Sequence, residues 1–447
     1  MDYLSAETKH IREFRAKDEG ALGIVRSTAM RKKSLPPGGH RQLKIAAVFG
    51  TRPEVIKLFP VIKQLEKHPN LQSLVISTSQ HREMIDELLP LFDLKLDHDL
   101  NIIQPNQSLT DISTRALAGL EAIFRQERPD LVLVQGDTTT AFAGALAAFY
   151  HKLPVGHLEA GLRSHDKTSP YPEEINRRLI ATIANLHFAP TVKNAVNLYR
   201  EGVHVEDIFV TGNTVIDALL HIAARKRGIL RDYLPAAALQ APRMILVTAH
   251  RRENQGASLE NLCHALKEIV QRHEDVHVVY PVHLNPNVRK TVFEILSGQE
   301  RIHLLAPLSY EPFVEAMMQA HLIITDSGGV QEEGPSLGKP ILVFRNETER
   351  PEGLAAGGVK LVGTRRESVV QEASRLLYDE AAYRRMSAVR NPYGDGQAAQ
   401  RLVQAILHHF GVSSRPENFF AATRAKQQAD PLFQAPLSAA PNLAIAA

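Results

Sequence analysis

Short apolar runs alternate with longer segments of helical period between residues 44 and 411 of this 447-residue chain. This alternation is typical of βαβ units, and therefore of parallel sheets covered by helices. A chain of this length exceeds what one hydrophobic core usually serves, so we expect an α/β fold of two doubly wound, Rossmann-like domains. The predicted strands fall into two sets: 44–49, 74–78, 131–134, 154–157, 187–189 and 208–211, then 244–248, 276–280, 302–306, 322–325, 341–344 and 360–362.

The ends of the chain differ from its centre. Residues 1–43 mix acidic and basic side chains without an apolar period and are predicted to be a disordered extension, although a start at Met30 would also leave the fold intact. Residues 412–447 are rich in Ala, Pro and Gln and are predicted to be a disordered tail. The first domain is predicted over 44–212 and the second over 213–396.

Composition excludes several classes of protein. A net charge of +3 is too small for a nucleic-acid coat, so no nucleic-acid partner is expected. The single cysteine, Cys263, gives no disulfide framework and no thiolate cluster, and we expect no metal and no cofactor. We find no membrane-spanning run and no signal peptide, so the expectation is a cytoplasmic protein without a membrane partner.

The strongest local signal is Asp326-Ser327-Gly328-Gly329, which leads from a predicted strand directly into a helix. Small residues at a helix N-terminus let backbone N–H groups approach a phosphate. Glu333 follows on the same helix, where its carboxylate suits the hydroxyls of a ribose. The alternative is a tight turn without a ligand. No Walker A motif and no GxGxxG follows a strand, so Mg²⁺-nucleotide and nicotinamide chemistry are unsupported.

Acidic residues that could take part in proton transfer occur in three segments of the first predicted domain. Asp137 comes directly after the strand 131–134, and Glu159 lies in an apolar stretch where desolvation would raise a carboxyl pKa towards the range useful for proton transfer. Glu173 and Glu174 start a predicted helix. Asp137 as a helix cap and the glutamates as a capping pattern are the structural alternatives.

Basic residues also follow predicted strands. Arg52 and Lys57 lie at the start of the first helix, where a phosphate would meet the helix dipole. His250 and Arg251 share a turn in the second half, and His283 follows the next strand. Each cluster could equally be an exposed, solvated surface.

These segments resemble the bacterial non-hydrolysing UDP-N-acetylglucosamine 2-epimerases over about residues 44 to 411. The resemblance rests on Phe-Gly-Thr-Arg-Pro-Glu at 49–54, Gly-Asp-Thr-Thr-Thr at 136–140, His-Leu-Glu-Ala-Gly-Leu-Arg at 157–163, Pro-Glu-Glu-Ile-Asn-Arg at 172–177, Thr-Ala-His-Arg-Arg-Glu-Asn at 248–254 and Asp-Ser-Gly-Gly-Val-Gln-Glu-Glu at 326–333. It implies a GT-B fold with the active site in the cleft between the domains and a last helix, 397–411, that returns to the first domain.

The resemblance also implies a reaction, the reversible C2 epimerisation of UDP-N-acetylglucosamine (UDP-GlcNAc) to UDP-N-acetylmannosamine (UDP-ManNAc). UDP is lost by anti elimination to 2-acetamidoglucal and then added back, and the product supplies ManNAc for surface polysaccharide. The implied catalytic residues are Asp137, Glu159, Glu173 and His250. The implied substrate-binding residues are Arg52, Lys57, Ser327, Gly328, Gly329, Glu333 and Arg350.

Some relatives bind a second UDP-GlcNAc as an activator. The positions that match are Gln80, Glu83, Arg251 and His283. We therefore expect allosteric activation, and separately we expect a homodimer. The alternatives are an epimerase of a UDP-diacetamido uronic acid, a glycosyltransferase on the same fold and a non-catalytic UDP-sugar sensor.

Overall fold

The computed structural model describes residues 42–80, 82–225 and 228–419, without the side chains of Glu83 and Met84. The predicted extension and tail lie outside these residues, apart from 42–43 and 412–419. The chain divides into two compact units. Within the described residues, unit 1 comprises 42–217 and 396–419, and unit 2 comprises 218–395.

Unit 1 contains a seven-stranded parallel sheet in the order β3-β2-β1-β4-β5-β6-β7. Its strands are β1 (Leu43–Phe49), β2 (Leu71–Ser77), β3 (His98–Asp99), β4 (Leu131–Gln135), β5 (Val155–Leu158), β6 (Leu186–Ala189) and β7 (Ile208–Val210). Its helices are α2 (Arg52–Glu66), α3 (Arg82–Asp86), α4 (Leu88–Leu91), α5 (Leu109–Glu127), α6 (Thr139–Tyr150), α7 (Glu173–Ile183), α8 (Val192–Arg200), the 3₁₀ helix η1 (Val205–Asp207) and α18 (Ala398–His409). The sequence patterns do not predict β3, because two residues are too few to show an alternation.

Unit 2 contains a six-stranded parallel sheet in the order β10-β9-β8-β11-β12-β13. Its strands are β8 (Arg243–Thr248), β9 (Val276–Pro281), β10 (Ile302–Leu305), β11 (Leu322–Thr325), β12 (Ile341–Val343) and β13 (Val359–Leu361). Its helices are α10 (Ala236–Leu239), α11 (Ala257–Arg272), α12 (Pro286–Leu296), α13 (Tyr310–Gln319), α14 (Gly328–Glu333), α15 (Pro351–Ala356), α16 (Arg366–Tyr378) and α17 (Glu380–Ser387), with 3₁₀ helices η2 (Ile229–Asp232), η3 (Arg252–Asn254) and η4 (Gly334–Leu337). The prediction of two doubly wound parallel sheets is confirmed.

The order of the strands decides where loops meet. Parallel neighbours end at the same edge of a sheet, so the turns after β1, β4 and β5 come together in unit 1, and those after β8 and β11 come together in unit 2. In the unit 1 sheet, the direction in which successive strands are added along the chain reverses between β1 and β4. In the unit 2 sheet, it reverses between β8 and β11. Such switch points are where open α/β sheets bind ligands.

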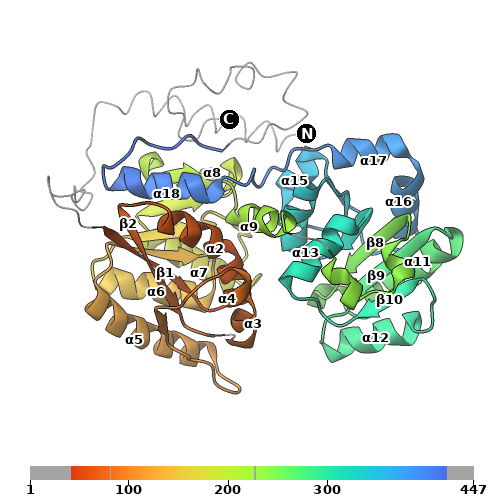
Figure 1. The fold of residues 1–447 in the computed structure, drawn as a ribbon, viewed down its shortest axis with the longest axis horizontal. Coiled ribbons are helices and arrows are strands. Elements are labelled where there is room, and N and C mark those ends of the chain that lie inside the picture. The colour runs from red at the N-terminus through yellow and green to blue at the C-terminus, as the bar shows by residue number, and fades with distance from the viewer. Residues whose placement is uncertain (1–41, 81, 226–227, 420–447) are drawn as a thin grey trace, which may run out of the picture. The chain divides into compact units, whose positions relative to one another are not determined.

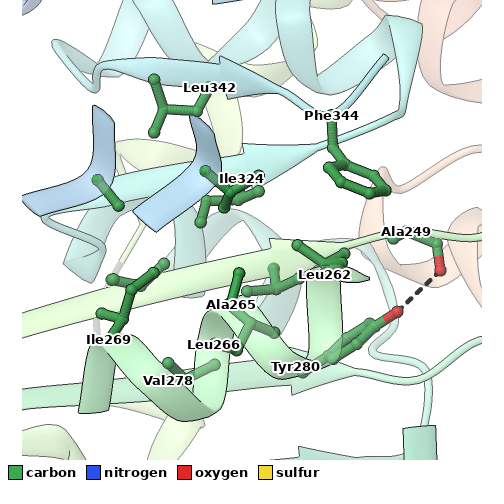
Figure 2. Packing of buried hydrophobic residues seen from close by; sticks show 14 of the residues in the cluster. Ala249, Leu262, Ala265, Leu266, Ile269, Val278, Tyr280, Ile324, Leu342 and Phe344 are labelled. Atoms are coloured by element: carbon green, nitrogen blue, oxygen red, sulfur yellow. Dashed lines mark hydrogen bonds between the residues drawn. The ribbon is translucent and has the colours of Figure 1, made fainter. Parts of the chain in front are cut away.

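The core of unit 2 explains how α11 is fixed. Leu262, Leu266 and Ile269 recur at helical spacing and pack with strand residues, among them Val278, as Figure 2 shows. Tyr280 is also fully buried, and its hydroxyl donates to the carbonyl oxygen of Ala249 at 3.0 Å. This bond satisfies a buried hydroxyl and fixes the end of β8 to β9.

Two connections pass between the units. The first runs through α9 (Thr214–Ala223), and the division falls after Asp217, a few residues beyond the boundary predicted after Gly212. The second precedes Gly396, after which α18 packs against α2 of unit 1 (Figure 1). The Asp217 carboxylate accepts hydrogen bonds from the backbone N–H groups of Ala398 and Ala399 at 3.2 and 2.9 Å, so it caps the start of α18.

Residues after α18 cover the edge strand β7. The backbone N–H of Phe419 donates to the carbonyl of Val210 at 2.7 Å, and the N–H of Val210 donates to the Asn418 side chain at 2.8 Å. The Arg415 guanidinium donates to the carbonyl oxygens of Glu206 and Ile208 and lies 4.2 Å from the centre of the Phe209 ring. An edge strand that would otherwise present unpaired backbone groups is therefore covered.

We predict that Arg415→Ala lowers the stability of unit 1 by about 2 kcal/mol, because it leaves these carbonyls without their donor and removes the contact with the ring. The matching transition in differential scanning calorimetry should fall by about 4–8 °C. Arg384→Ala is the control, since the Arg384–Glu380 pair has both side chains 74% exposed and should contribute nothing measurable. Equal shifts in the two variants would contradict this role of Arg415.

Candidate active site

The turn after β1 is organised by a buried carboxylate. Glu54 is the third residue of α2, and its Oε2 accepts hydrogen bonds from the backbone N–H groups of Gly50 and Thr51 at 2.9 and 2.8 Å and from the Thr51 hydroxyl at 2.8 Å. Its Oε1 accepts from the Thr138 hydroxyl at 2.6 Å, in the turn after β4. Burial raises the pKa of Glu54, and the bond from Thr138 opposes that rise. Glu54 therefore joins two adjacent turns.

The position of Glu54 after β1 carries a local sequence signal for the structural role described above. Thr51 followed by a glutamate three residues later is a capping box, which predicts that this carboxylate turns back onto the start of the helix. Helix α2 begins at Arg52, and Pro53 occupies its second position. The Arg52 guanidinium makes no hydrogen bond or ion pair with the described residues.

Asp137 does not cap a helix. The N-cap of α6 is Thr138, whose hydroxyl accepts the backbone N–H of Ala141 at 3.0 Å. Oδ2 of Asp137 accepts hydrogen bonds from Nε and Nη2 of Arg177 at 3.0 and 2.5 Å, while its side chain keeps 25% exposure. Desolvation raises the pKa of Asp137, Arg177 lowers it and Glu159 raises it. The net direction is upward, which is what a carboxyl that exchanges protons near neutral pH needs.

Glu159 is held in an unusual backbone conformation directly after β5. Its φ is +58°, in the left-handed region, which costs a non-glycine residue about 1 kcal/mol. Its Oε2 pairs with Nζ of Lys57 on α2 at 2.5 Å and also accepts a hydrogen bond from the Gln135 amide. The side chains of Lys57 and Glu159 are 17% and 7% exposed. Lys57 therefore lies against a carboxylate in this structure.

The two glutamates that start α7 differ in their surroundings. Glu174 is fully buried and accepts hydrogen bonds from the backbone N–H groups of Ser164 and His165 at 3.0 and 3.2 Å and from Arg177 at 3.3 Å. Oε2 of Glu173 is buried without a hydrogen-bond partner among the described residues. Glu174 is thus committed to structure, whereas Glu173 has an oxygen left for a ligand.

Two buried histidines lie on neighbouring strands of the unit 1 sheet, β5 and β6. His157 on β5 is paired in register with His187 on β6, and Nε2 of His157 hydrogen-bonds the carbonyl of Gly136 at 2.7 Å. A carbonyl only accepts, so Nε2 carries the proton. Burial lowers the pKa of His157 to about 4 and that of His187 to about 3. Both are therefore uncharged at neutral pH, and His157 supports the Gly136-Asp137 turn.

In unit 2 a second buried carboxylate joins two turns. Asp326 is fully buried, and its Oδ2 accepts hydrogen bonds from the backbone N–H groups of His250 and Arg251 at 2.9 and 2.8 Å and from the Asn254 amide at 3.1 Å. The predicted phosphate loop therefore begins at Ser327, because Asp326 faces the protein. Nδ1 of His250 lies 3.7 Å from Oδ1 of Asp326, and burial lowers the pKa of His250 while Asp326 acts to raise it.

The Ser327-Gly328-Gly329 turn lies at the start of α14, as predicted. Ser327 is the N-cap residue, and its backbone N–H donates to the Thr325 hydroxyl at 2.9 Å. A Cβ placed on Gly328 would lie 3.7 Å from both Nη2 of Arg251 and Oε1 of Glu349. The glycine therefore faces an arginine, and a phosphate at this turn would meet that charge and the N–H groups of the first helical turn.

Carboxylates balance the arginines near this turn. Arg251 pairs with Glu349 at 2.9 Å and Arg345 pairs with it at 2.6 Å, while Arg350 pairs with Glu332. Burial acts to raise the pKa of Glu349, but the nearby arginines outweigh it and hold that pKa at about 2. An anionic ligand would therefore compete with carboxylates for these guanidinium groups.

The remaining predicted residues have structural contacts of their own. Oε1 of Glu333 accepts the Tyr310 hydroxyl at 3.0 Å, and Oε2 would lie 3.8 Å from a Cβ on Gly329. Oε1 of Gln80 accepts the Thr140 hydroxyl at 3.0 Å. The rings of His283 and His250 stack with centres 5.1 Å apart. The side chain of Glu83 lies outside the described residues.

The described residues include no group of three or more His, Cys, Asp or Glu placed to hold a metal ion. No helix in that part of the chain is long and apolar enough to cross a membrane. What the geometry offers is acid–base chemistry from Asp137, Glu159 and Glu173 in unit 1 and an anion-binding turn in unit 2.

Comparison with known proteins agrees with this geometry. A family model described as UDP-N-acetylglucosamine 2-epimerase matches residues 63–407. The UDP-N-acetylglucosamine 2-epimerase of Escherichia coli is 52% identical over 374 residues, 82% of this chain and 99% of the relative. That of Bacillus subtilis is 49% identical over 383 residues, 85% of this chain and 99% of the relative. The structure of the Neisseria meningitidis UDP-GlcNAc 2-epimerase bound to UDP-GlcNAc is similar with a TM-score of 0.75 and 46% identity, and it covers 82% of this chain and 100% of that one.

The buried histidines predict how stability depends on pH. Their folded-state pKa values lie below the value of about 6.5 expected in the unfolded chain, so unfolding takes up protons below pH 6.5. The contribution of these two histidines to the free energy of unfolding is therefore fully present above pH 6.5 and is lost as the pH falls towards 4. Between pH 7 and pH 5 each histidine should cost unit 1 about 2 kcal/mol.

Thermal unfolding at pH 7 and pH 5 checks this expectation. His187→Gln should lose less stability between the two pH values than the unsubstituted protein does. His264→Gln, at an exposed position on α11, should behave like the unsubstituted protein. The same pH dependence in all three proteins would show that the buried histidines are not responsible.

Proposed function

Because the chain belongs to the UDP-N-acetylglucosamine 2-epimerase family and is an isomerase, we propose that it interconverts UDP-GlcNAc and UDP-ManNAc. The observation that carries the proposal is the set of carboxyl groups at one edge of the unit 1 sheet, where Asp137 and Glu159 influence each other's charge. The Neisseria meningitidis relative holds UDP-GlcNAc in its structure.

The reaction requires two bonds to break in a defined order. The hydrogen at C2 of the sugar is not acidic, so departure of UDP must begin to build positive charge at C1 before a base can remove the C2 proton. The C1–O electron pair leaves with the β-phosphate, and the C2–H electron pair becomes the C1=C2 double bond of 2-acetamidoglucal. A proton then returns to the opposite face of C2 as UDP adds back to C1.

Unit 2 suits the leaving group. Backbone N–H groups of the Ser327-Gly328-Gly329 turn would donate hydrogen bonds to the diphosphate oxygens, with His250 beside them, and Glu333 would accept hydrogen bonds from the ribose hydroxyls. Arg350 of the same unit would contribute positive charge, and Arg52 of unit 1 is a further basic residue that the family resemblance assigns to substrate binding. Stabilising UDP as it departs lowers the barrier to breaking the C1–O bond.

Unit 1 suits the proton transfers. Arg177 hydrogen-bonds only Oδ2 of Asp137, which leaves Oδ1 for a substrate. The buried Oε2 of Glu173 has no hydrogen-bond partner among the described residues, and Glu159 is held by Lys57. In the proposal these three carboxyl groups exchange protons with the sugar, and which of them acts on each face of C2 is left open.

Three further parts of the proposal rest on the family resemblance. A second UDP-GlcNAc would act as an activator beside Gln80, Glu83, Arg251 and His283. The assembly would be a homodimer. The product would supply ManNAc to a surface polysaccharide.

Incubation with UDP-GlcNAc in D₂O tests the proposed reaction directly. Removal and return of the C2 proton should exchange it with solvent, so NMR should show deuterium at C2 together with the appearance of UDP-ManNAc. The control is protein inactivated by heat. Substrate recovered without label after prolonged incubation with native protein would refute the elimination mechanism.

A substitution separates chemistry from folding. Asp137→Asn should lower kcat by about 10²–10⁴-fold, because an amide cannot exchange the proton, while UDP binding measured by calorimetry stays within a few-fold. Asp130→Asn is a matched control, since Asp130 lies before the opposite end of β4 and accepts the backbone N–H of Lys44 at 2.9 Å. If Asp137→Asn abolished UDP binding as well, the residue would be structural.

A further inference from the structure

The Asn213 side chain lies against Glu159. Asn213 is 3% exposed and stands between β7 and α9 in unit 1. Its Nδ2 donates to Oε1 of Glu159 at 3.2 Å, and its Oδ1 accepts the backbone N–H of Val215 at 3.1 Å. One amide thus contacts both a proposed catalytic carboxylate and the first turn of a helix.

The two contacts fix the orientation of the amide. A backbone N–H can only donate, so the atom that faces Val215 must be the oxygen, and the atom that faces Glu159 must then be the NH₂ group. The reversed orientation would place NH₂ against N–H and oxygen against a carboxylate. Asn213 therefore donates to Glu159, and a residue that only accepts could not replace it.

The donors on Glu159 divide between its two oxygens. Lys57 and Gln135 contact Oε2, and Asn213 contacts Oε1. Rotation about the last side-chain bond would break contacts on both oxygens at once. Because the backbone of Glu159 is also confined to the left-handed region, the direction of its carboxyl group is set from both ends.

We propose that Asn213 is a positioning residue for the proposed epimerisation, one that holds the Glu159 carboxylate through Oε1 while its amide oxygen caps the start of α9. The proposal rests on the acid–base role proposed above for Glu159. It adds a residue outside the three carboxylates and links one of them to α9, in which the first segment of unit 1 ends.

Asn213→Asp tests the donor separately from the cap. An aspartate keeps an oxygen for the Val215 N–H but replaces the donor to Glu159 by a second negative charge. Among the described residues, the charged and titratable groups near Glu159 include Lys57 from α2, Asp137 after β4 and His157 from β5, and the substitution changes none of these three. Asn213→Ser keeps a capping oxygen and removes the donor without adding charge.

A control variant reproduces the chemical change elsewhere. Oδ1 of Asn185 accepts the backbone N–H of Val155 at 2.9 Å, at the opposite end of β5 from Glu159. Asn185→Asp therefore also converts an amide whose oxygen accepts a backbone N–H into a carboxylate in the same unit. It should leave the titration of Glu159 and the turnover unchanged.

The first measurement is the titration of the Glu159 carboxyl carbon by ¹³C NMR, with the resonance assigned by its loss in Glu159→Gln. Asn213→Asp should raise the pKa of Glu159 by about one unit or more, because two adjacent carboxyl groups cannot both ionise freely, and Asn213→Ser should raise it less. An unchanged pKa in both variants would overturn the proposal and leave Asn213 as a helix cap only.

The second measurement is the pH profile of kcat with UDP-GlcNAc. The acidic limb should move to higher pH in Asn213→Asp, with about a ten-fold loss of kcat at pH 7 and a small change in KM. A changed KM with an unmoved profile would contradict positioning. If the unsubstituted protein did not exchange the C2 proton in D₂O, the proposed function would fail, while the NMR titration would still decide whether Asn213 sets the state of Glu159.

Discussion

Each unit depends on a buried carboxylate that joins the turns after two adjacent central strands. In unit 1 Glu54, from the first turn of α2, accepts hydrogen bonds from the turn after β1 and from Thr138 after β4. In unit 2 Asp326, after β11, reaches the backbone of His250 and Arg251 after β8. An isolated buried carboxylate is costly, so each is stable only because several donors surround it. Pairing of the strands does not itself fix the conformation of the loops at a switch point. The hydrogen bonds of the buried carboxylate hold the two loops in one conformation.

For the proposed chemistry, the consequence is that two of the candidate residues, Asp137 and Arg52, stand on turns that one carboxylate joins. Asp137 adjoins Thr138, and Arg52 lies between Thr51 and Glu54, so one carboxylate sets the places of both. Arg177 and Asn176 of α7 then hold Asp137 from the other side. Preorganisation of this kind reduces the rearrangement needed when charge develops on a substrate.

Much of the fold follows from the sequence because parallel strands are buried on both faces and read as continuous apolar runs. The glycine turn at Ser327-Gly328-Gly329 is also local, since a strand, small residues and a helix follow one another directly. Partners distant along the chain cannot be read in this way. The sequence suggests that Lys57 binds a phosphate. In the structure its ammonium group contacts Glu159, which is 102 residues further along the chain.

Short-range patterns were also ambiguous where two similar residues adjoin. Glu173 and Glu174 are equivalent in the sequence, and only the direction of each side chain from α7 makes Glu174 a buried acceptor and leaves an oxygen of Glu173 without a partner. Asp137 and Thr138 are both good N-cap residues, and the geometry of the turn assigns the cap to Thr138. Because Thr138 caps α6 and Glu174 binds the backbone of Ser164, Asp137 and Glu173 keep carboxylate oxygens for the roles proposed for them.

The return of the chain to unit 1 after Gly396 has a consequence for biosynthesis. Within the described residues unit 2 is continuous in sequence, so its strands β8 to β13 are all synthesised before α18. Unit 1 is not, because α18 packs on α2 and residues 415–419 cover β7 only after the intervening unit has been made. During translation α2 and the edge strand β7 therefore lack these covering segments until unit 2 has been synthesised.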